Sequence, residues 1–389
     1  AVAHAIEDGV ITHEAPPEGW REKVDRLLLN EWTGGPVLVL ILAGFFWLVF
    51  GIGQRVEAPL GEAFNWLKLS VAEQFPAGSL AATVADGLVM GLAGGVAIVL
   101  PYLIPFLIGL AVLEDTGYLP RLAYILDSFM HRMGLHGKSV LPMILGYGCS
   151  VPAIMSTRIL ESEKDRRITA TLTSFIPCSA RTVVIFGLVA AFMGPIWALT
   201  IYLVNIFVVV VLGTIMAKRM KGASPGLVLE IPELSLPDIK TLGAKTWLAL
   251  TEFITIAWPL LIASSIVLGV LEWAHAADAI NALLSPLTVW LLGLPAVVGM
   301  TLVFGLLRKE LTLVMLVQAL GTTEVNTVLS TQQLLTFTLF VVFYVPCIAT
   351  IAVLAKQMGW RSALAISGFT VVVAIVISVA GRLFYGIFV

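Results

Sequence analysis

The sequence predicts an all-α polytopic membrane protein, with one N-terminal transmembrane helix followed by two inverted repeats that each contain a re-entrant helical hairpin. Of its 389 residues, 59% are hydrophobic and only 12% are charged. Soluble domains are closer to half apolar and a quarter charged, so this composition excludes that class. The formal net charge of −2 provides no basic surface for nucleic acid. Three cysteines, an odd number and all within apolar stretches, argue against a disulfide framework.

The N-terminal part predicts a polar segment and then a first span. Residues 1–34 lack the basic start and apolar core of a signal peptide, and we interpret them as a cytoplasmic linker stub. Gly35–Ile52 is apolar and predicts the first transmembrane helix. Residues 53–86 carry an acidic excess and aromatic patches, which predicts an external segment that lies at the membrane interface.

Later apolar runs predict further spans and two hairpins. Ser139–Leu160 is interrupted at its centre, and Lys and Arg flank it on both sides. Because such residues mark the cytoplasmic side, this segment is predicted to enter and leave there. Pro286–Leu320 lies between loops without Lys or Arg, so it predicts a second hairpin that enters from outside. The remaining runs are Gly87–Leu113, Ile168–Met193, Pro195–Ala217, Thr246–Leu271, Leu334–Ala355 and Ala363–Phe388.

This order of segments occurs twice. Residues 87–217 and 246–389 each predict a span, a hairpin, a span with a Pro-Cys break and a final span, separated by a cytoplasmic loop at 218–245. Basic residues near 21–26 place the N-terminus in the cytoplasm, so the two units begin on opposite membrane sides. Ile176-Pro177-Cys178 matches Val345-Pro346-Cys347, and GYGC at 146–149 corresponds to GLLRKE at 305–310. Inverted repeats with broken helices are a transporter architecture.

Each cysteine lies at a Pro or Gly break in an apolar run. Such breaks free backbone carbonyls, which is tolerated only where protein or a water-filled cavity covers them. Thiolates bind soft and borderline cations, so Cys149, Cys178 and Cys347 predict a metal path. The alternative is that buried free cysteines act as small hydrophobic residues.

Charged residues inside the apolar runs are further candidates. Arg308, Lys309 and Glu310 interrupt a long run, although a charge at the bilayer centre costs about 2.5–3.5 kcal/mol. They predict either a gate at the hairpin tip, where the Glu310 carboxylate helps to neutralise a dication, or a cytoplasmic turn between ordinary spans. Arg181 follows Cys178 by three residues, and we expect a carboxylate partner for it.

Three other patterns were weighed for ligand binding. Glu114 and Asp115 end an apolar run and predict either cation ligands or a polar helix end. Gly137-Lys138-Ser139 has Arg132 where a phosphate-binding loop requires glycine, so no nucleotide site is predicted. His131 and His136 are five residues apart, which misses the i, i+4 spacing of helical metal pairs and predicts interfacial histidines.

Several long motifs resemble the membrane domain of the FeoB ferrous-iron transporters. They are LEDTGYLPRLAYILD at 113–127, GLHGKSVLPMILGYGCSVPAIMSTRILE at 134–161, FIPCSARTVVIFGLVAAF at 175–192, GLLRKEL and YVPCIATIAVLAK. The resemblance implies Fe(II) as the transported substrate, paired Gate repeats like those of concentrative nucleoside transporters, and a prokaryotic cytoplasmic membrane. It also implies that Cys149, Cys178 and Cys347 correspond to the proposed translocation cysteines. Independently of the resemblance, we assign Arg308, Lys309 and Arg181 a gating role as a hypothesis from their charge within apolar runs.

The sequence departs from the family in two places. The family normally carries an N-terminal GTP-binding domain, which this chain lacks, so we expect that domain in cis or in trans and no enzymatic activity here. Ser150 stands where the family commonly has Asn, and it is a candidate ligand beside Cys149. A small accessory Feo protein and a homo-oligomer are further expected partners. Two other functions stay open, an organic-solute transporter and a metal-sensing membrane receptor that does not transport.

Overall fold

The computed structural model describes residues 20–76, 78–220, 234–235, 237–309, 312–321 and 325–388, and over these residues all regular structure is helical. Within these described ranges, six helices are long and apolar enough to cross a membrane. The predicted all-α polytopic class is therefore confirmed. The candidate spans are Thr33–Val71, Leu80–Asp115, Pro195–Arg219, Ile239–Trp273, Thr331–Met358 and Trp360–Gly386.

The helices fall into an N-terminal pair and two series in the same order. The N-terminal pair is α2 (Trp20–Leu29) and α3 (Glu31–Ala72). The first series is α4 (Leu80–Ala93), η1 (Gly94–Val99), α5 (Leu100–Asp115), α6 (Tyr118–Arg132), η2 (Gly137–Ser139), α7 (Val140–Gly148), α8 (Ser150–Ser156), η3 (Thr157–Ile159), α9 (Glu163–Thr173), α10 (Ser179–Val184), η4 (Ile185–Ala190) and α11 (Pro195–Arg219). The second series is α12 (Ile239–Glu252), η5 (Phe253–Ala257), α13 (Trp258–Trp273), α14 (Ala277–Ser285), η6 (Pro286–Leu291), α15 (Val298–Leu307), α16 (Thr312–Leu320), η8 (Val325–Thr327), α17 (Thr331–Phe343), α18 (Ile348–Met358) and α19 (Trp360–Phe388).

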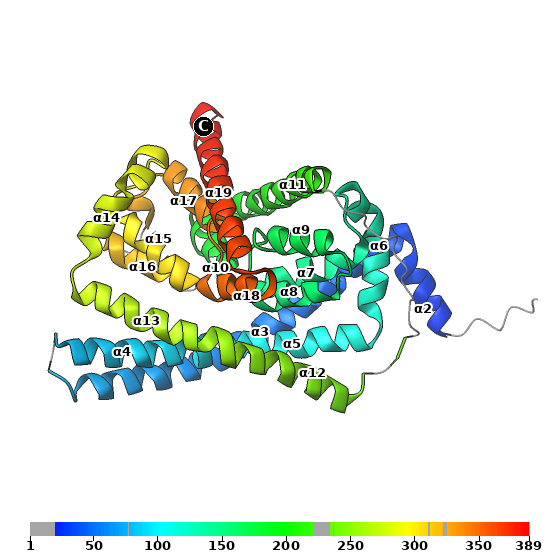
Figure 1. Cartoon of the computed structure of the whole chain (residues 1–389), viewed down its shortest axis with the longest axis horizontal. Coiled ribbons are helices and arrows are strands. Elements are labelled where there is room, and N and C mark those ends of the chain that lie inside the picture. The colour runs from blue at the N-terminus through cyan, green and yellow to red at the C-terminus, as the bar shows by residue number, and fades with distance from the viewer. Residues whose placement is uncertain are drawn as a thin grey trace, which may run out of the picture.

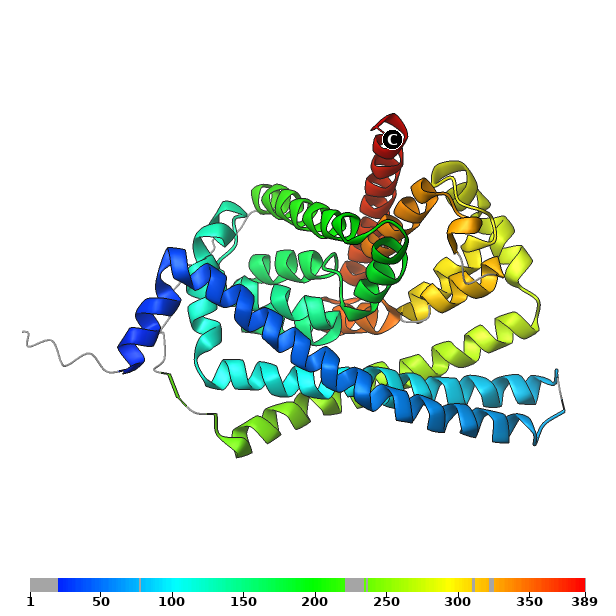
Figure 2. The same ribbon diagram turned by 180° about the vertical axis from the view of Figure 1, so that it is seen from behind.

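Helix α3 differs from its predicted form. The span expected to end at Ile52 continues as one helix to Ala72, so most of the segment expected at the membrane interface is the second half of α3. Two of the charged residues in this half of α3 have partners on neighbouring helices: the Tyr102 hydroxyl donates to Glu57, and Lys68 lies 3.1 Å from Asp86. Pairing lowers the cost of carrying these groups on a long helix. Figure 2 shows α3, in dark blue, running in front of and alongside α4 and α5.

The two series meet along an antiparallel pair of long helices, α4–α5 and α12–α13 (Figure 1). The N-terminal half of one helix, α4, packs on the C-terminal half of the other, α13, and α5 packs on α12. Glycines permit the close approach, since a Cβ added to Gly87 would lie 2.8 Å from the Ile266 Cα and one on Gly91 would lie 2.6 Å from the Ile262 Cα. Small residues spaced four apart are the usual means of close helix packing in membranes.

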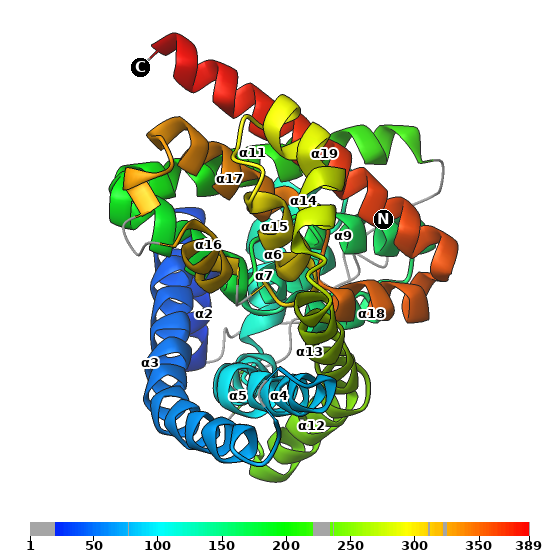
Figure 3. The same cartoon turned by 90° about the vertical axis from the view of Figure 1, so that its left-hand side faces the viewer.

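The most buried span is the broken helix α17–α18. Within its most hydrophobic window 72% of residues are buried, against 11–33% in the other five candidate spans. Its counterpart in the first series, α9–α10, is buried in the same way, with Phe175 and Leu172 fully enclosed. The Pro-Cys breaks therefore lie within the most buried segments of the two series. Figure 3 shows the long helices α3 and α19 at the outside of the molecule, with α7, α9 and α17 between them.

Each series also contains two short helices that pack on each other across a break. We name α7–α8 hairpin 1 and α15–α16 hairpin 2. The second hairpin was expected to begin at Pro286. Residues 286–291 instead extend α14, and the chain turns at Gly293, where φ is +69°, before α15 begins. The steric freedom of glycine at positive φ explains this boundary.

Candidate functional site

Cys149 forms the tip of hairpin 1. It is a single extended residue, with φ −146° and ψ 130°, between the end of α7 and the start of α8. Its N–H donates to the Leu145 carbonyl at 3.0 Å and so closes α7. Gly148, directly before it, faces Phe106 so closely that a side chain would overlap the ring. The local sequence therefore builds a sharp corner with the thiol at its centre.

Cys178 and Cys347 occupy matching positions at the two Pro-Cys breaks. Each is the extended residue that immediately precedes a helix, with ψ of 173° before α10 and 157° before α18. All three cysteines thus stand at the N-terminus of a helix, where the helix dipole favours a thiolate. Each thiol is free and partly buried. The Cys347 sulfur lies 3.0 Å from the Thr350 hydroxyl.

The three thiols face one region without forming a closed ligand cluster. Cys178 and Cys347 are both within electrostatic range of Cys149, although the three belong to separate breaks. Among the described residues, only Asp127, His131 and His136 form a group of three ligand side chains whose donor atoms lie within 4.8 Å of one another. A cation held by all three thiols therefore requires the breaks to move closer together.

Arg181 joins the two breaks, and its partners differ from the predicted carboxylate. The guanidinium donates to the carbonyls of Ser174 and Ile176 at 2.9 and 3.2 Å, and to the Tyr344 carbonyl at 2.8 Å. Breaks leave such carbonyls without helical partners, and a guanidinium can satisfy several at once. The prediction of a carboxylate partner was wrong because it overlooked these acceptors, which the Pro-Cys breaks themselves create.

Arg308 and Lys309 form the described part of the hairpin 2 tip. They are only 2% and 4% exposed, which does not fit the alternative of a cytoplasmic surface turn. Arg308 donates to the Met90 carbonyl at 3.1 Å and to the Ser265 hydroxyl at 3.3 Å, where it lies against Gly94 in η1. The Lys309 ammonium lies 4.8 Å from the centroid of the Tyr344 ring. Tyr344 is therefore a site residue that the sequence interpretation missed.

The remaining candidates lie in three different places. Ser150 is buried at the start of α8, directly after Cys149. Glu114 and Asp115 pair with Lys245, at 3.0 and 2.7 Å, where α5 meets α12. These ion pairs match the polar helix end that was the alternative to cation ligands. Glu310 lies outside the described residues.

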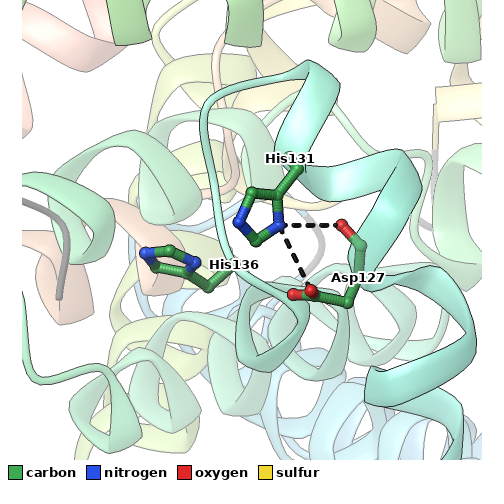
Figure 4. Close-up of side chains that lie close together, drawn as sticks. All are labelled: Asp127, His131 and His136. Carbon is green, nitrogen blue, oxygen red and sulfur yellow. Dashed lines mark hydrogen bonds and ion pairs between the residues drawn. The ribbon is translucent and has the colours of Figure 1, made fainter. Parts of the chain in front are cut away.

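Asp127, His131 and His136 lie close together at the end of α6 (Figure 4). His131 Nδ1 is 3.2 Å from Asp127 Oδ2, and the two imidazole centroids are 5.0 Å apart. Sequence spacing alone does not join the two histidines, because residues five apart do not share one face of a helix. His136 is beyond the end of α6, and the turn at Gly134, where φ is +68°, brings it back.

Two family models match this chain, and together they extend from residue 96 to residue 361 with short gaps. The sequence model of the Gate family, described as nucleoside recognition, matches residues 96–192 and 254–361, more than half of the chain. A second model, described as the C terminus of ferrous iron transport protein B, matches residues 198–248. One Gate match lies within each series of helices, and together the two matches include all three cysteines.

Curated relatives share these matches. An Fe(2+) transporter FeoB of Methanocaldococcus jannaschii is 29% identical over 94% of this chain and 59% of its own length. An Fe(2+) transporter FeoB of Campylobacter jejuni is 34% identical over 59% of this chain and 38% of its own length. A fusion of Fe(2+) transport protein A with FeoB from Porphyromonas gingivalis is 32% identical over 65% of this chain and 30% of its own length.

The chain spans at most about three fifths of the length of these relatives. Among solved structures, a variant of CNTnw in an outward-facing state aligns with a TM-score of 0.43 and 16% identity, over 89% of this chain and 91% of that one.

Proposed function

This chain belongs to the FeoB family, as a multi-pass part with the Gate repeats, and on that premise we propose that it moves Fe(II) across a membrane. The observation that carries the proposal is the placement of Cys149, Cys178 and Cys347. Each stands in extended backbone before a helix at a buried break. Thiolates at helix N-termini suit a borderline cation such as Fe(II).

Movement of the ion requires a change in the distances between the breaks. The thiols are within electrostatic range of one another but do not form a closed set of ligands. We propose that Fe(II) passes from thiol to thiol, with Ser150 as an additional oxygen ligand beside Cys149. Weak or partial coordination favours release as well as entry, which transport requires.

Two buried cations control this path in the proposal. Arg181 and Lys309 both lie within electrostatic range of Cys178 and Cys347. Their positive charges oppose a dication unless the thiols ionise or an acid contributes. Glu310, the next residue after Lys309, is the carboxylate proposed to supply that charge. Arg308 anchors the described part of the hairpin 2 tip to the Met90 carbonyl and the Ser265 hydroxyl.

Anaerobic Fe(II) uptake into liposomes that contain the purified chain tests the proposal. We expect uptake by the parent, strongly reduced uptake by Cys149→Ser and Cys178→Ser, and strongly reduced uptake by Glu310→Gln. Gly44→Ala is the matched control, because a Cβ at that position of α3 meets no atom within 4 Å. Equal uptake by folded parent and cysteine variants would contradict the thiol path.

The same liposomes test the alternatives. Uptake of a labelled nucleoside without Fe(II) uptake would support an organic-solute transporter, the reading favoured by the description of the Gate family. Fe(II) binding without uptake, with or without an added GTP-binding domain, would support a metal-sensing receptor. The cysteine variants separate these outcomes, since only the iron transporter requires the thiols for flux.

Partners and location follow from the relatives and from charge. We propose that a GTP-binding domain, in cis or in trans, acts with this chain, since the relatives extend well beyond it. The fusion protein from Porphyromonas gingivalis supports a small accessory Feo protein as a second partner. The positive-inside rule supports a cytoplasmic N-terminus in a prokaryotic cytoplasmic membrane, with inverted repeats.

A further inference from the structure

The group Asp127, His131 and His136 has the chemistry of a metal site, and the proposed Fe(II) path does not use it. Asp127 and His131 lie one helical turn apart on α6, and His136 approaches them from the following turn (Figure 4). One donor atom from each residue lies within 4.8 Å of the other two. A cation at the centre of such a group could reach all three with only small movements of the side chains.

Asp127 is held in place by one of its two oxygens. Its Oδ1 accepts a hydrogen bond of 2.6 Å from the backbone N–H of Gly137, while Oδ2 faces His131. A backbone donor on one oxygen orients a carboxylate and leaves the other for an ion, as is common around bound metals. Gly137 permits this approach, because a Cβ there would overlap the Ala123 carbonyl.

His136 supplies the second observation. Both of its ring nitrogens are buried, and neither has a hydrogen-bond partner. Buried polar atoms are nearly always paired, and one left unpaired costs about 1–3 kcal/mol. A metal ion would accept one nitrogen as a ligand and remove part of that cost. His131 is more exposed, which leaves an entry path from solvent.

We propose that Asp127, His131 and His136 bind a divalent transition cation, with water in the remaining positions. Two imidazoles and one carboxylate suit Fe(II), Co(II), Ni(II) or Zn(II) better than Ca(II) or Mg(II), which prefer oxygen ligands alone. The site is distinct from the three thiols in both its ligands and its position, and it would exist whether or not the chain transports iron.

The site lies where hairpin 1 begins. His136 directly precedes η2, which leads into α7 and the tip at Cys149. An ion held between His136 and the two ligands of α6 would therefore fasten the base of hairpin 1 to α6. On the other side of that base, Lys138 pairs with Glu161 at 3.0 Å. Occupancy should stabilise this base against local opening.

Co(II) titration of the purified full chain tests the site. The three cysteines are first replaced by serine, so that no thiol contributes and the outcome is independent of the transport proposal. The ligand variants are Asp127→Asn, which keeps an oxygen acceptor for Gly137, together with His131→Gln and His136→Gln. The matched control is His275→Asn, which removes another histidine at a position where φ is +51°, a conformation that asparagine tolerates.

The cysteine-free protein should bind one Co(II) with an absorption spectrum typical of nitrogen and oxygen ligands. Each ligand variant should lose about tenfold or more in affinity, while His275→Asn should bind as the cysteine-free parent does. Co(II) should also raise the melting temperature of the cysteine-free parent but not that of Asp127→Asn. Unchanged Co(II) affinity in folded ligand variants, or an equal loss in His275→Asn, would overturn the proposal.

Discussion

Cys149 and Arg308 occupy equivalent backbone positions in the two hairpins. Each is an extended residue with φ near −140°, at −146° and −140°, and each closes the preceding helix by donating its N–H to the carbonyl four residues earlier. Their side chains have opposite chemistry. Cys149 places a thiol at the hairpin 1 tip, while Arg308 reaches Met90 and Ser265 on the long helix pair. The equivalent backbone position therefore holds a candidate metal ligand in hairpin 1 and a side chain that anchors the tip in hairpin 2.

The two Pro-Cys breaks differ in the same way, because only one of them carries an arginine that bonds to a distant segment. Cys178 and Cys347 have the same position before α10 and α18, but the third residue after each differs. In the first series it is Arg181, which crosses to the Tyr344 carbonyl of the other break. In the second it is Thr350, whose described contact is local, with the Cys347 sulfur. The two breaks thus have matching backbone positions, while the hydrogen bond between them comes from Arg181 of the first series.

Removing Arg181 should have the largest effect on stability. Arg181→Gln loses most of three hydrogen bonds to buried carbonyls, and bonds from charged donors contribute about 1.5–3 kcal/mol each. We expect a loss of about 4 kcal/mol in the free energy of unfolding, measured by thermal and chemical unfolding in detergent. Thr350→Val, at the equivalent position, should lose no more than about 1 kcal/mol. Similar losses in both variants would remove the distinction between the breaks.

Single substitutions at the two hairpin tips should give the next largest effect on the free energy of unfolding. Arg308→Met removes two hydrogen bonds to α4 and α13, and we expect a loss of about 3 kcal/mol in the free energy of unfolding. Cys149→Ser removes no contact of that strength and should change stability by less than about 1 kcal/mol. The same denaturation experiments measure both. A stable Arg308→Met would mean that hairpin 2 does not depend on its anchor.

The sequence predicted the features that depend on local signals. Pro and Gly next to each cysteine indicated the breaks, and the repeated order of apolar runs indicated two equivalent series. The long interrupted run around Arg308 and Lys309 indicated a hairpin tip. The breaks at the three cysteines are confirmed, since each cysteine directly precedes a helix. They could be predicted because Pro and Gly interrupt a helix at or next to their own positions.

Two predictions failed because they depended on contacts between distant segments. The end of α3 was misplaced because the pairing of Glu57 with Tyr102 and of Lys68 with Asp86 cannot be read from either segment alone. Arg181 was given a carboxylate partner, whereas one carbonyl that it binds, that of Tyr344, belongs to the other break, 163 residues along the chain. The start of hairpin 2 was misplaced for a local reason, the turn at Gly293.

A smaller effect is expected where the two repeats face each other. A Cβ at Gly91 would lie 2.6 Å from the Ile262 Cα, so α4 and α13 would have to separate in Gly91→Ala. Overpacking of this kind typically costs about 1–3 kcal/mol, and we expect about 2 kcal/mol in unfolding experiments. Gly44→Ala, which meets no atom within 4 Å, is the control and should leave stability unchanged. A tolerated Gly91→Ala would argue that the antiparallel pairing does not hold the repeats together.

The smallest change in stability, and the most informative change in binding, is expected for Lys309→Met. The ammonium makes a cation–π contact with Tyr344, which stabilises the protein by about 0.5–2 kcal/mol. Burial of the charged group destabilises the protein and so opposes this contribution. The two effects should cancel to within about 1 kcal/mol. Met also retains most of the packing volume of the lysine chain.

Binding of a dication should respond differently from stability. Lys309 lies within electrostatic range of Cys178 and Cys347, so its charge repels any cation held there. Lys309→Met should therefore bind Fe(II) several-fold more tightly in an anaerobic titration, since one repulsive charge in a medium of low dielectric is removed. Arg308→Met should not show this gain, because its guanidinium is directed toward the long helix pair rather than the thiols. If both variants gained affinity equally, net charge rather than position would determine binding, and the two residues of the hairpin 2 tip would have no separate roles.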